Sequence, residues 1–192
     1  MHERTPSVLH PSPARMSVDE FLVWASTVSG RYELVDGVPI AMAAERAGHA
    51  RAKLALVNAL REAIARAGLP CEAFTDGMTV RIDEHNGFEP DAVVHCGEPI
   101  DDDESEVPSP VIVVEVVSPW SIGRDSNTKL DDYFRVASVR HYLIVDTRSR
   151  RVVHYRRGDD GEPAVSLASG DTLTLDPPGI EPSLQSMSSD GR

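Results

Sequence analysis

The sequence predicts an α/β fold, in which a mixed central β-sheet has helices on both faces and is preceded by an N-terminal helix and a β-hairpin. Three features support this prediction. The run at 111–117 is apolar and mostly β-branched, which is typical of a central strand buried on both faces. The segment 49–67 has apolar residues at steps of three and four, which indicates an amphipathic helix. Apolar runs at 141–145 and 152–155 follow a second amphipathic segment, so helices and strands alternate.

The N-terminal elements have clear boundary signals. Residues 17–20 form a capping-box pattern ahead of an apolar stretch, which predicts the start of a short helix. The Asp-Gly pair at 36–37 separates two apolar runs within 32–42, and this arrangement is a strong signal for a hairpin. Glu33 lies on the first arm of the predicted hairpin.

The remaining elements follow from hydrophobic periodicity and from residues that break it. The helix at 49–67 is expected to pack on the sheet and to end before Gly68 and Pro70. A further helix is predicted at 125–137. The apolar positions of the first of these helices are Leu54, Val57, Leu60, Ile64 and Ala67. The other predicted strands are 79–82, 91–96, 141–145, 152–155 and 165–167.

The predicted domain organisation is simple. A chain of 192 residues is long enough for one α/β domain and too short for two of ordinary size. We therefore predict one domain over 16–176. Residues 1–15 contain several prolines, and residues 177–192 are rich in proline, serine and glycine, so they are predicted to be a disordered leader and a disordered tail.

Composition limits the classes of function. The net charge of −12 argues against broad, nonspecific attraction to nucleic acid, which depends on lysine and arginine. No apolar run has the length of a membrane span and the N-terminus lacks a secretory pattern, so a cytoplasmic protein is expected. No glycine-rich phosphate loop follows a strand, so no nucleotide cofactor is expected. In a reducing compartment, Cys71 and Cys96 are expected to be buried thiols.

Two acidic residues indicate a site for a divalent cation. Glu115 interrupts the apolar run at 111–117, and a buried carboxylate has to be paired, protonated or bound to a metal ion. Asp91 opens the predicted neighbouring strand. Carboxylate oxygens are hard ligands that suit Mg²⁺ or Mn²⁺. An amine nearby could orient a water molecule and offset the charge that grows on a phosphoryl group, and Lys129 is the candidate.

Structural roles for the same residues are left open at this point. Glu115 could form a buried ion pair with Lys129 or Arg124, without any metal. Asp91 follows a proline, where aspartate is common in turns. Lys129 could be a surface residue bridged to Asp125, because the two are four residues apart on the predicted helix.

Pro90-Asp91, followed after a loop by Glu115-Val116-Val117, resembles the motif of the PD-(D/E)xK nuclease superfamily. In that motif a lysine stands two residues after the glutamate, where this chain has Val117. The block 115–146 is similar to the Uma-two family of restriction-endonuclease-like proteins, in which the lysine has moved to the following helix. Lys129 matches the migrated lysine, and the resemblance extends over about residues 16–175.

The resemblance implies a restriction-endonuclease-like fold and a metal-dependent endonuclease that hydrolyses DNA phosphodiester bonds with a Mg²⁺- or Mn²⁺-activated water. Asp91, Glu115 and the carbonyl of Val116 would be the metal ligands. Lys129 would assist the water, and Glu33 would join the site as an additional carboxylate. A homodimer is also expected from the family.

A second group of residues is expected to support these ligands. It comprises Ser118, Asp125, His49 and Tyr133. The alternative function is a catalytically silent module that keeps the nuclease fold for binding or dimerisation, which the acidic composition favours. A complete Glu33, Asp91, Glu115 and Lys129 set would favour catalysis, whereas a site blocked by neighbouring side chains would favour the silent module.

Overall fold

The computed structural model describes residues 15–117, 126–146, 148–159 and 161–187, and this part of the chain contains two β-sheets and four helices. The larger sheet has the strand order β10-β9-β8-β7-β6-β3. Its strands are β3 (Cys71–Thr75), β6 (Ala92–Cys96), β7 (Pro110–Val117), β8 (His141–Asp146), β9 (Arg151–Arg157) and β10 (Pro163–Leu167). The smaller sheet has the order β2-β1-β5-β4 and consists of β1 (Tyr32–Val35), β2 (Val38–Ala41), β4 (Val80–Arg81) and β5 (Gly87–Phe88).

The predicted α/β class is confirmed, because the larger sheet is mixed and helices cover both of its faces. Strands β7 and β8 are parallel, whereas β7 pairs with β6 in the antiparallel sense. Helices α2 (Ala47–Ala67) and α4 (Leu184–Met187) pack on one face in a core that includes Val114. Helix α3 (Ser126–Arg135) packs on the other face, where Tyr133 lies against Val113.

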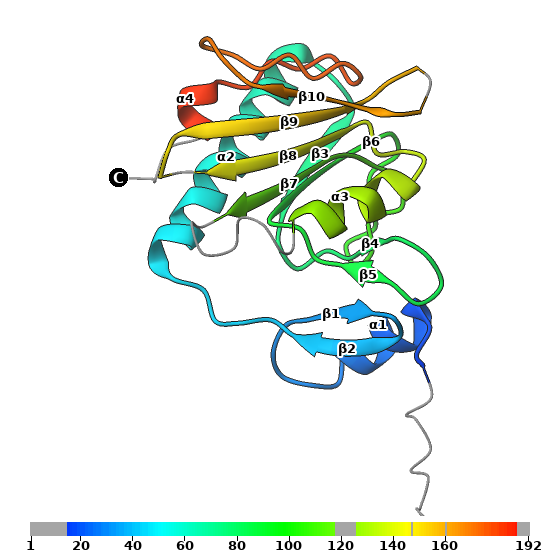
Figure 1. Cartoon of the computed structure of the whole chain (residues 1–192). Coiled ribbons are helices and arrows are strands. Elements are labelled where there is room, and N and C mark those ends of the chain that lie inside the picture. Colours follow the sequence, from blue (N-terminus) through cyan, green and yellow to red (C-terminus); the bar gives the residue numbers. More distant parts are fainter. Residues whose placement is uncertain (1–14, 118–125, 147, 160, 188–192) are drawn as a thin grey trace, which may run out of the picture.

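The N-terminal elements form a lobe below the larger sheet, next to β4 and β5 (Figure 1). Helix α1 (Val18–Ala25) begins with the predicted capping box, in which the Ser17 hydroxyl accepts from the Glu20 amide and the Glu20 carboxylate accepts from the Ser17 amide. The predicted hairpin is also present, and its turn residues Asp36 and Gly37 have φ values of 50° and 75°. Two positive φ values in succession are typical of the tight turns that join antiparallel strands.

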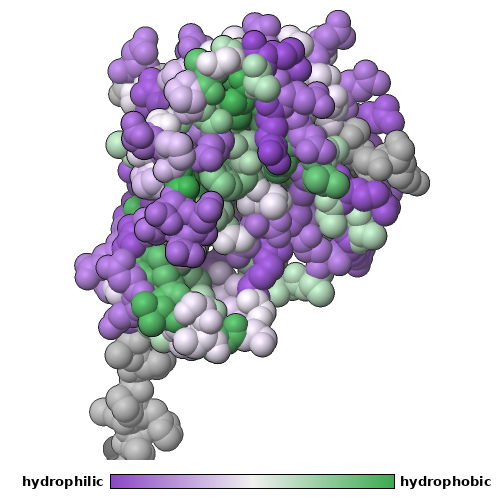
Figure 2. Space-filling model, turned by 180° about the vertical axis from the view of Figure 1, so that it is seen from behind, coloured by the Kyte–Doolittle hydropathy of each residue, from purple (hydrophilic) through white to green (hydrophobic). Residues whose placement is uncertain are grey.

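Hydrophobic side chains are visible on the surface of this lobe. Seen from behind, most of the molecule is covered by hydrophilic side chains, and hydrophobic ones are visible in the lower part, where the lobe lies, and again near the top (Figure 2). The exposed large apolar residues of the lobe are Val23, Val35, Val38 and Ile40.

The phase of the predicted 49–67 helix needs correction. Helix α2 begins at Ala47, and Leu54, which we placed on the apolar face, is 62% exposed. Leu56 is buried in its place. The helix still packs on the sheet as expected, through a face that includes Leu60 and Ile64.

The prediction of a disordered tail is wrong for residues 177–187. Ile180, Leu184 and Met187 are buried in the same core as α2. Their apolar side chains are buried beside α2 on the same face of the sheet, and this burial outweighs the local signal of the prolines and serines. Residues 188–192, and residues 1–14 of the predicted leader, lie outside the described part of the chain.

The expectation of two free thiols is also wrong. Cys71 and Cys96 form a disulfide. They are directly opposite each other in the antiparallel pair β3 and β6. Strand β3 was not predicted from the sequence, so the two cysteines had no predicted reason to meet. None of the helices in the described residues has the length and apolar character needed to cross a bilayer.

A histidine pair ties the C-terminal segment to the larger sheet. His141, the first residue of β8, is fully buried, and its Nδ1 lies 2.8 Å from Nε2 of His154 on β9. Its Nε2 lies 2.8 Å from the carbonyl oxygen of Pro177. Because a carbonyl only accepts, Nε2 is the donor in that bond and Nδ1 of the neutral ring accepts from His154.

We expect His141 to make the protein less stable in mild acid. Burial and the neighbouring His154 lower its pKa from 6.5 to about 4. The unfolded chain therefore binds a proton that the folded chain does not, so this contribution to stability is complete above pH 6.5 and is lost as the pH falls towards 4. Urea unfolding at pH 7 and pH 5 should show a loss on the order of 2 kcal/mol from this group.

The variant His141→Phe should lack this part of the pH dependence. His85→Phe is a suitable control, because the His85 side chain is 38% exposed, whereas His141 is fully buried. If wild type and His141→Phe lose the same free energy of unfolding between the two pH values, His141 is not the group responsible.

Candidate active site

The pairing of β6 with β7 brings the two predicted metal ligands together. In this antiparallel pair Ala92 is opposite Val114, which places Asp91 opposite Glu115. Residues directly opposite each other have side chains on the same face of a sheet. The Asp91 carboxylate accepts a hydrogen bond from the Val116 amide, with 2.7 Å between Oδ2 and N.

Lys129 comes from α3 and reaches two carboxylates at once. Its Nζ lies 2.8 Å from Oε1 of Glu33 and 3.2 Å from Oε1 of Glu115. Tyr133, one turn later on the same helix, donates to the same Glu115 oxygen at 3.1 Å. The structure therefore brings together Glu33, Glu115, Lys129 and Tyr133, as expected from the sequence, with Asp91 beside them.

Glu33 attaches the hairpin to this cluster. The residue lies on β1, and its Oε1 accepts from Lys129 and also from the backbone amide of Glu89 at 3.1 Å. Glu89 precedes Asp91 by two residues, so the same carboxylate contacts the segment that leads into β6. The contact joins the smaller sheet to the edge of the site.

Burial and charge oppose the ionisation of Glu115. Its side chain is 15% exposed, and its pKa is raised to about 7 by burial and by the charges of Asp91 and Glu33, against the lowering effect of Lys129. Burial alone would lower the pKa of Lys129, but the charges of Glu115 and Glu33 raise it above its ordinary value. Burial and the Glu115 charge raise the pKa of Tyr133. Lysine therefore stays charged and tyrosine stays protonated as donors to these carboxylates.

Helix α2 contributes a second group of side chains on the other side of Asp91. His49 Nε2 lies 3.1 Å from Asp91 Oδ1, and this hydrogen bond raises the pKa of His49. Ligand atoms of Glu45, His49 and Asp91 lie within 4.8 Å of one another, which makes them a group that could hold a cation. Glu45 was not predicted from the sequence.

Lys53 lies behind this group and is 3% exposed. Its ammonium group forms ion pairs with Glu45 and Asp76 and lies 3.8 Å from Asp91 Oδ1. His49 and Lys53 are four residues apart, so they share one side of the start of α2, and Glu45 lies in the segment just before the helix. For Lys53, that spacing was the sequence signal available.

The other end of α3 is held by Arg157 on β9. Its guanidinium donates to the carbonyl oxygens of Phe134, Val136 and Val139 and lies over the Phe134 ring. These carbonyls belong to the end of the helix and the turn that follows it, where backbone acceptors lack helical partners. Arg157 therefore fixes the direction in which α3 presents Lys129.

The cluster opens into two cavities. One, of about 550 Å³, is lined by Glu33 and Lys129 together with parts of the hairpin and α3. The other, of about 470 Å³, is lined by Glu45, His49 and Asp91. The predicted site residues Ser118 and Asp125, and the alternative partner Arg124, lie outside the described residues.

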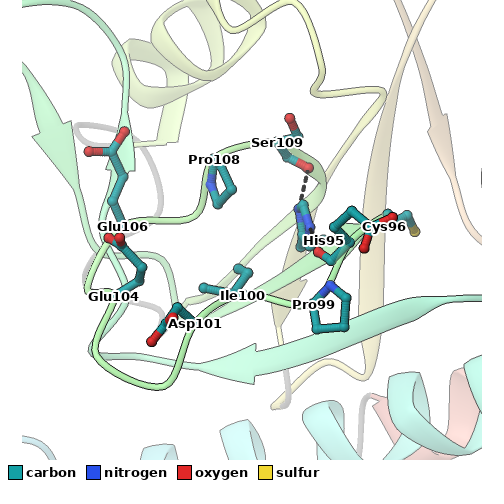
Figure 3. A pocket seen from close by; sticks show the side chains of 11 residues that line it. His95, Cys96, Pro99, Ile100, Asp101, Glu104, Glu106, Pro108 and Ser109 are labelled. Carbon is teal, nitrogen blue, oxygen red and sulfur yellow. Dashed lines mark hydrogen bonds between the residues drawn. The ribbon is translucent and has the colours of Figure 1, made fainter.

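A further cavity of about 580 Å³ lies at the opposite end of β6, around His95 (Figure 3). Four acidic residues line it, and His95 is bonded to the carbonyl oxygens of Ser109 and Glu98. Its acids do not suit a phosphate group, and none of the predicted site residues lines it. The acidic residues are Glu98, Asp101, Glu104 and Glu106.

Comparison with known proteins agrees with the resemblance in the motifs. Two uncharacterised proteins of Synechocystis sp. are each 26% identical over 164 residues, which cover 84% of this chain and 92% and 83% of theirs. The crystal structure of a putative nuclease belonging to DUF820 from Anabaena variabilis matches with a TM-score of 0.66. That match covers 92% of this chain and 99% of the other at 14% identity, so it shows the fold.

The family itself follows from the extent of the sequence match. The model of the Uma2 family, described as "Putative restriction endonuclease", matches residues 18–186. This span runs from the start of α1 into α4 and includes the core residues Ile180 and Leu184. The chain belongs to the Uma2 family of putative restriction endonucleases.

Proposed function

We propose that the protein is a divalent-metal-dependent endonuclease that hydrolyses phosphodiester bonds in DNA. The observation that carries the proposal is the convergence of two carboxylates from adjacent strands with one amine from α3. Family membership and the nuclease fold support this reaction class, and the geometry of these side chains supports the role that we propose for each.

The residues present fit a hard divalent cation. Asp91 and Glu115 provide oxygen ligands. The pKa of Glu115 is raised to about 7 by burial and, to a smaller extent, by the charges of Asp91 and Glu33, which a bound cation would offset. The Val116 amide donates to Asp91, and the N–H and C=O of one strand residue project to the same side, so the Val116 carbonyl projects towards the β6 side of β7. When bound, Mg²⁺ or Mn²⁺ would supply Lewis-acid stabilisation of the phosphoryl oxygens and lower the pKa of a water.

Lys129 has the position and charge for the second part of the chemistry. Its ammonium group stays protonated, so it can hydrogen-bond the attacking water and offset the negative charge that grows on the phosphoryl oxygens. Glu33 holds that ammonium at 2.8 Å and so orients it. Tyr133 donates to Glu115 and keeps that carboxylate in place.

The catalytically silent module has less support. The predicted set of Glu33, Asp91, Glu115 and Lys129 is complete at one junction of the fold. One cavity reaches Glu33 and Lys129 and another reaches Asp91, so the described side chains around these three residues leave them accessible. The ion pair between Lys129 and Glu115 is the observation that still suits a purely structural site, and metal binding separates the two cases.

A divalent cation should raise the melting temperature, and the rise should be larger at pH 8 than at pH 6. Below pH 7, Glu115 keeps its proton, which a cation has to displace. Differential scanning fluorimetry with Mg²⁺, Mn²⁺ or EDTA at the two pH values measures this. The absence of any metal-induced shift at pH 8 would remove the basis of the metal site.

Lys129→Ala should abolish cleavage and leave the metal-induced thermal shift in place. Loss of one charged donor to a transition state typically costs on the order of a hundredfold or more in rate. Plasmid nicking with Mn²⁺ provides the assay, and Arg51→Ala, on an exposed part of α2, is the matched loss of a positive charge. Cleavage at the wild-type rate by Lys129→Ala would exclude the amine from the reaction.

Glu115→Gln should flatten the dependence of apo stability on pH. The raised pKa means that the protonated carboxyl stabilises the fold fully below pH 4.5, and this contribution is lost as the pH rises through about 7. Wild type should therefore lose stability from this group between pH 5 and pH 8 without metal, and the neutral variant should not. A severe loss of stability in the variant at both pH values would instead identify a structural ion pair.

A further inference from the structure

The cavity of about 550 Å³ beside Lys129 is lined in part by apolar side chains, which make no favourable contact with a phosphate group. Val35, Ile40 and Phe88 form an apolar part of its lining. Val35 is 38% exposed and Ile40 is 49% exposed, so large apolar side chains face water directly next to the proposed catalytic residues. Such exposure is costly in a site that handles only charged groups.

Strand pairing explains why these apolar side chains lie at the site. Ile40 is directly opposite Glu33 in the hairpin, and Val35 lies two residues after Glu33 on the same strand. All three side chains therefore project from one face of the small sheet. Phe88 comes from β5, and its ring centroid is 5.5 Å from Lys129 Nζ, so the apolar wall continues to the amine.

The charges around the cavity do not favour binding of several consecutive backbone phosphates. Three acidic residues line it, against the two cations Lys129 and Arg135, and Arg135 is already paired with Asp83 and Asp132. The net charge of the chain is −12. A flat, uncharged and polarisable group attached to one phosphate fits these walls better than a run of backbone does. The acidic lining residues are Glu33, Asp36 and Asp132.

We propose that this cavity takes one unpaired nucleobase beside the scissile phosphate, so that the substrate is DNA with single-stranded character. In a duplex, stacking covers both faces of each base, and a base reaches such a pocket only when it is unpaired or turned out of the helix. The volume lies in the range of sites that enclose small ligands. This inference rests on the proposed nuclease function, because that function places the phosphate at Lys129.

Binding without cleavage tests the inference. The probes are a fluorescein-labelled single strand and a blunt hairpin duplex that contains the same sequence, with Ca²⁺ in place of Mg²⁺ and anisotropy as the readout. The single strand should bind about tenfold more tightly than the duplex, which is the scale of one stacked base. Equal or tighter binding of the duplex, or no binding of either probe, would overturn the proposal.

A charge placed in the apolar wall tests the location of the base. Ile40→Asp should weaken binding of the single strand about tenfold and leave binding of the duplex nearly unchanged. Val165→Asp is the control, because Val165 is an exposed β-branched residue on the edge strand β10 and does not line the cavity. Should Ile40→Asp fail to fold by circular dichroism, Val35→Asp tests the same wall. A folded wall variant that binds the single strand like wild type contradicts the proposal.

Cleavage assays distinguish failure of this inference from failure of the proposed function. Metal-dependent cutting of duplex DNA, with no preference for single strands and no effect of Ile40→Asp, would leave the nuclease in place and remove the base pocket. Selective single-strand binding that Ile40→Asp weakens, without cleavage of any DNA in Mg²⁺ or Mn²⁺, would keep the pocket and remove the catalytic function.

Discussion

The position of the Lys129 ammonium group between Glu33 and Glu115 is the interaction on which the site depends. It connects α3 to a strand of each sheet. Without the amine, two carboxylates would lie close together with little exposure to water, and both repulsion and lost hydration would oppose that arrangement. Arg157 holds the far end of the same helix, so contacts at both ends of α3 determine where the amine lies.

Asp91 is the second residue on which the site depends, because it contacts both β7 and α2. One of its oxygens accepts from the Val116 amide, and the other faces His49 on α2. A carboxylate that uses separate oxygens in this way keeps one orientation, which favours a preorganised ligand. Lys53 supplies a buried positive charge 3.8 Å from Asp91, which offsets negative charge at this place in a chain that is strongly acidic as a whole.

Moving the lysine from strand to helix has a physical consequence for the sheet. Val117, at the position where the superfamily motif has lysine, is 8% exposed and continues the apolar run of β7. The strand therefore stays buried up to its end, and the charged group approaches from α3 instead. In this chain a charged amine therefore reaches Glu115 from α3, without a second charge inside the central strand.

The sequence by itself determined the elements whose signals are local. The capping box of α1, the Asp-Gly turn at 36–37 and the apolar run of β7 each depend on neighbouring residues, and each has the predicted form. The proximity of Asp91 and Glu115 was also predictable, because both lie on strands that follow each other along the chain. Their meeting with Lys129 was predictable only through the family resemblance.

Tertiary structure alone decided the features that depend on distant parts of the chain. Glu45 and Lys53 approach Asp91 because the fold brings the start of α2 next to Asp91, and nothing near them in sequence specifies that contact. The C-terminal segment packs on the fold because Ile180 and Met187 are buried in the same core as α2, although its composition suggested disorder. Local patterns fix backbone conformation over a few residues, whereas burial and ion pairing depend on which surfaces the whole fold brings into contact.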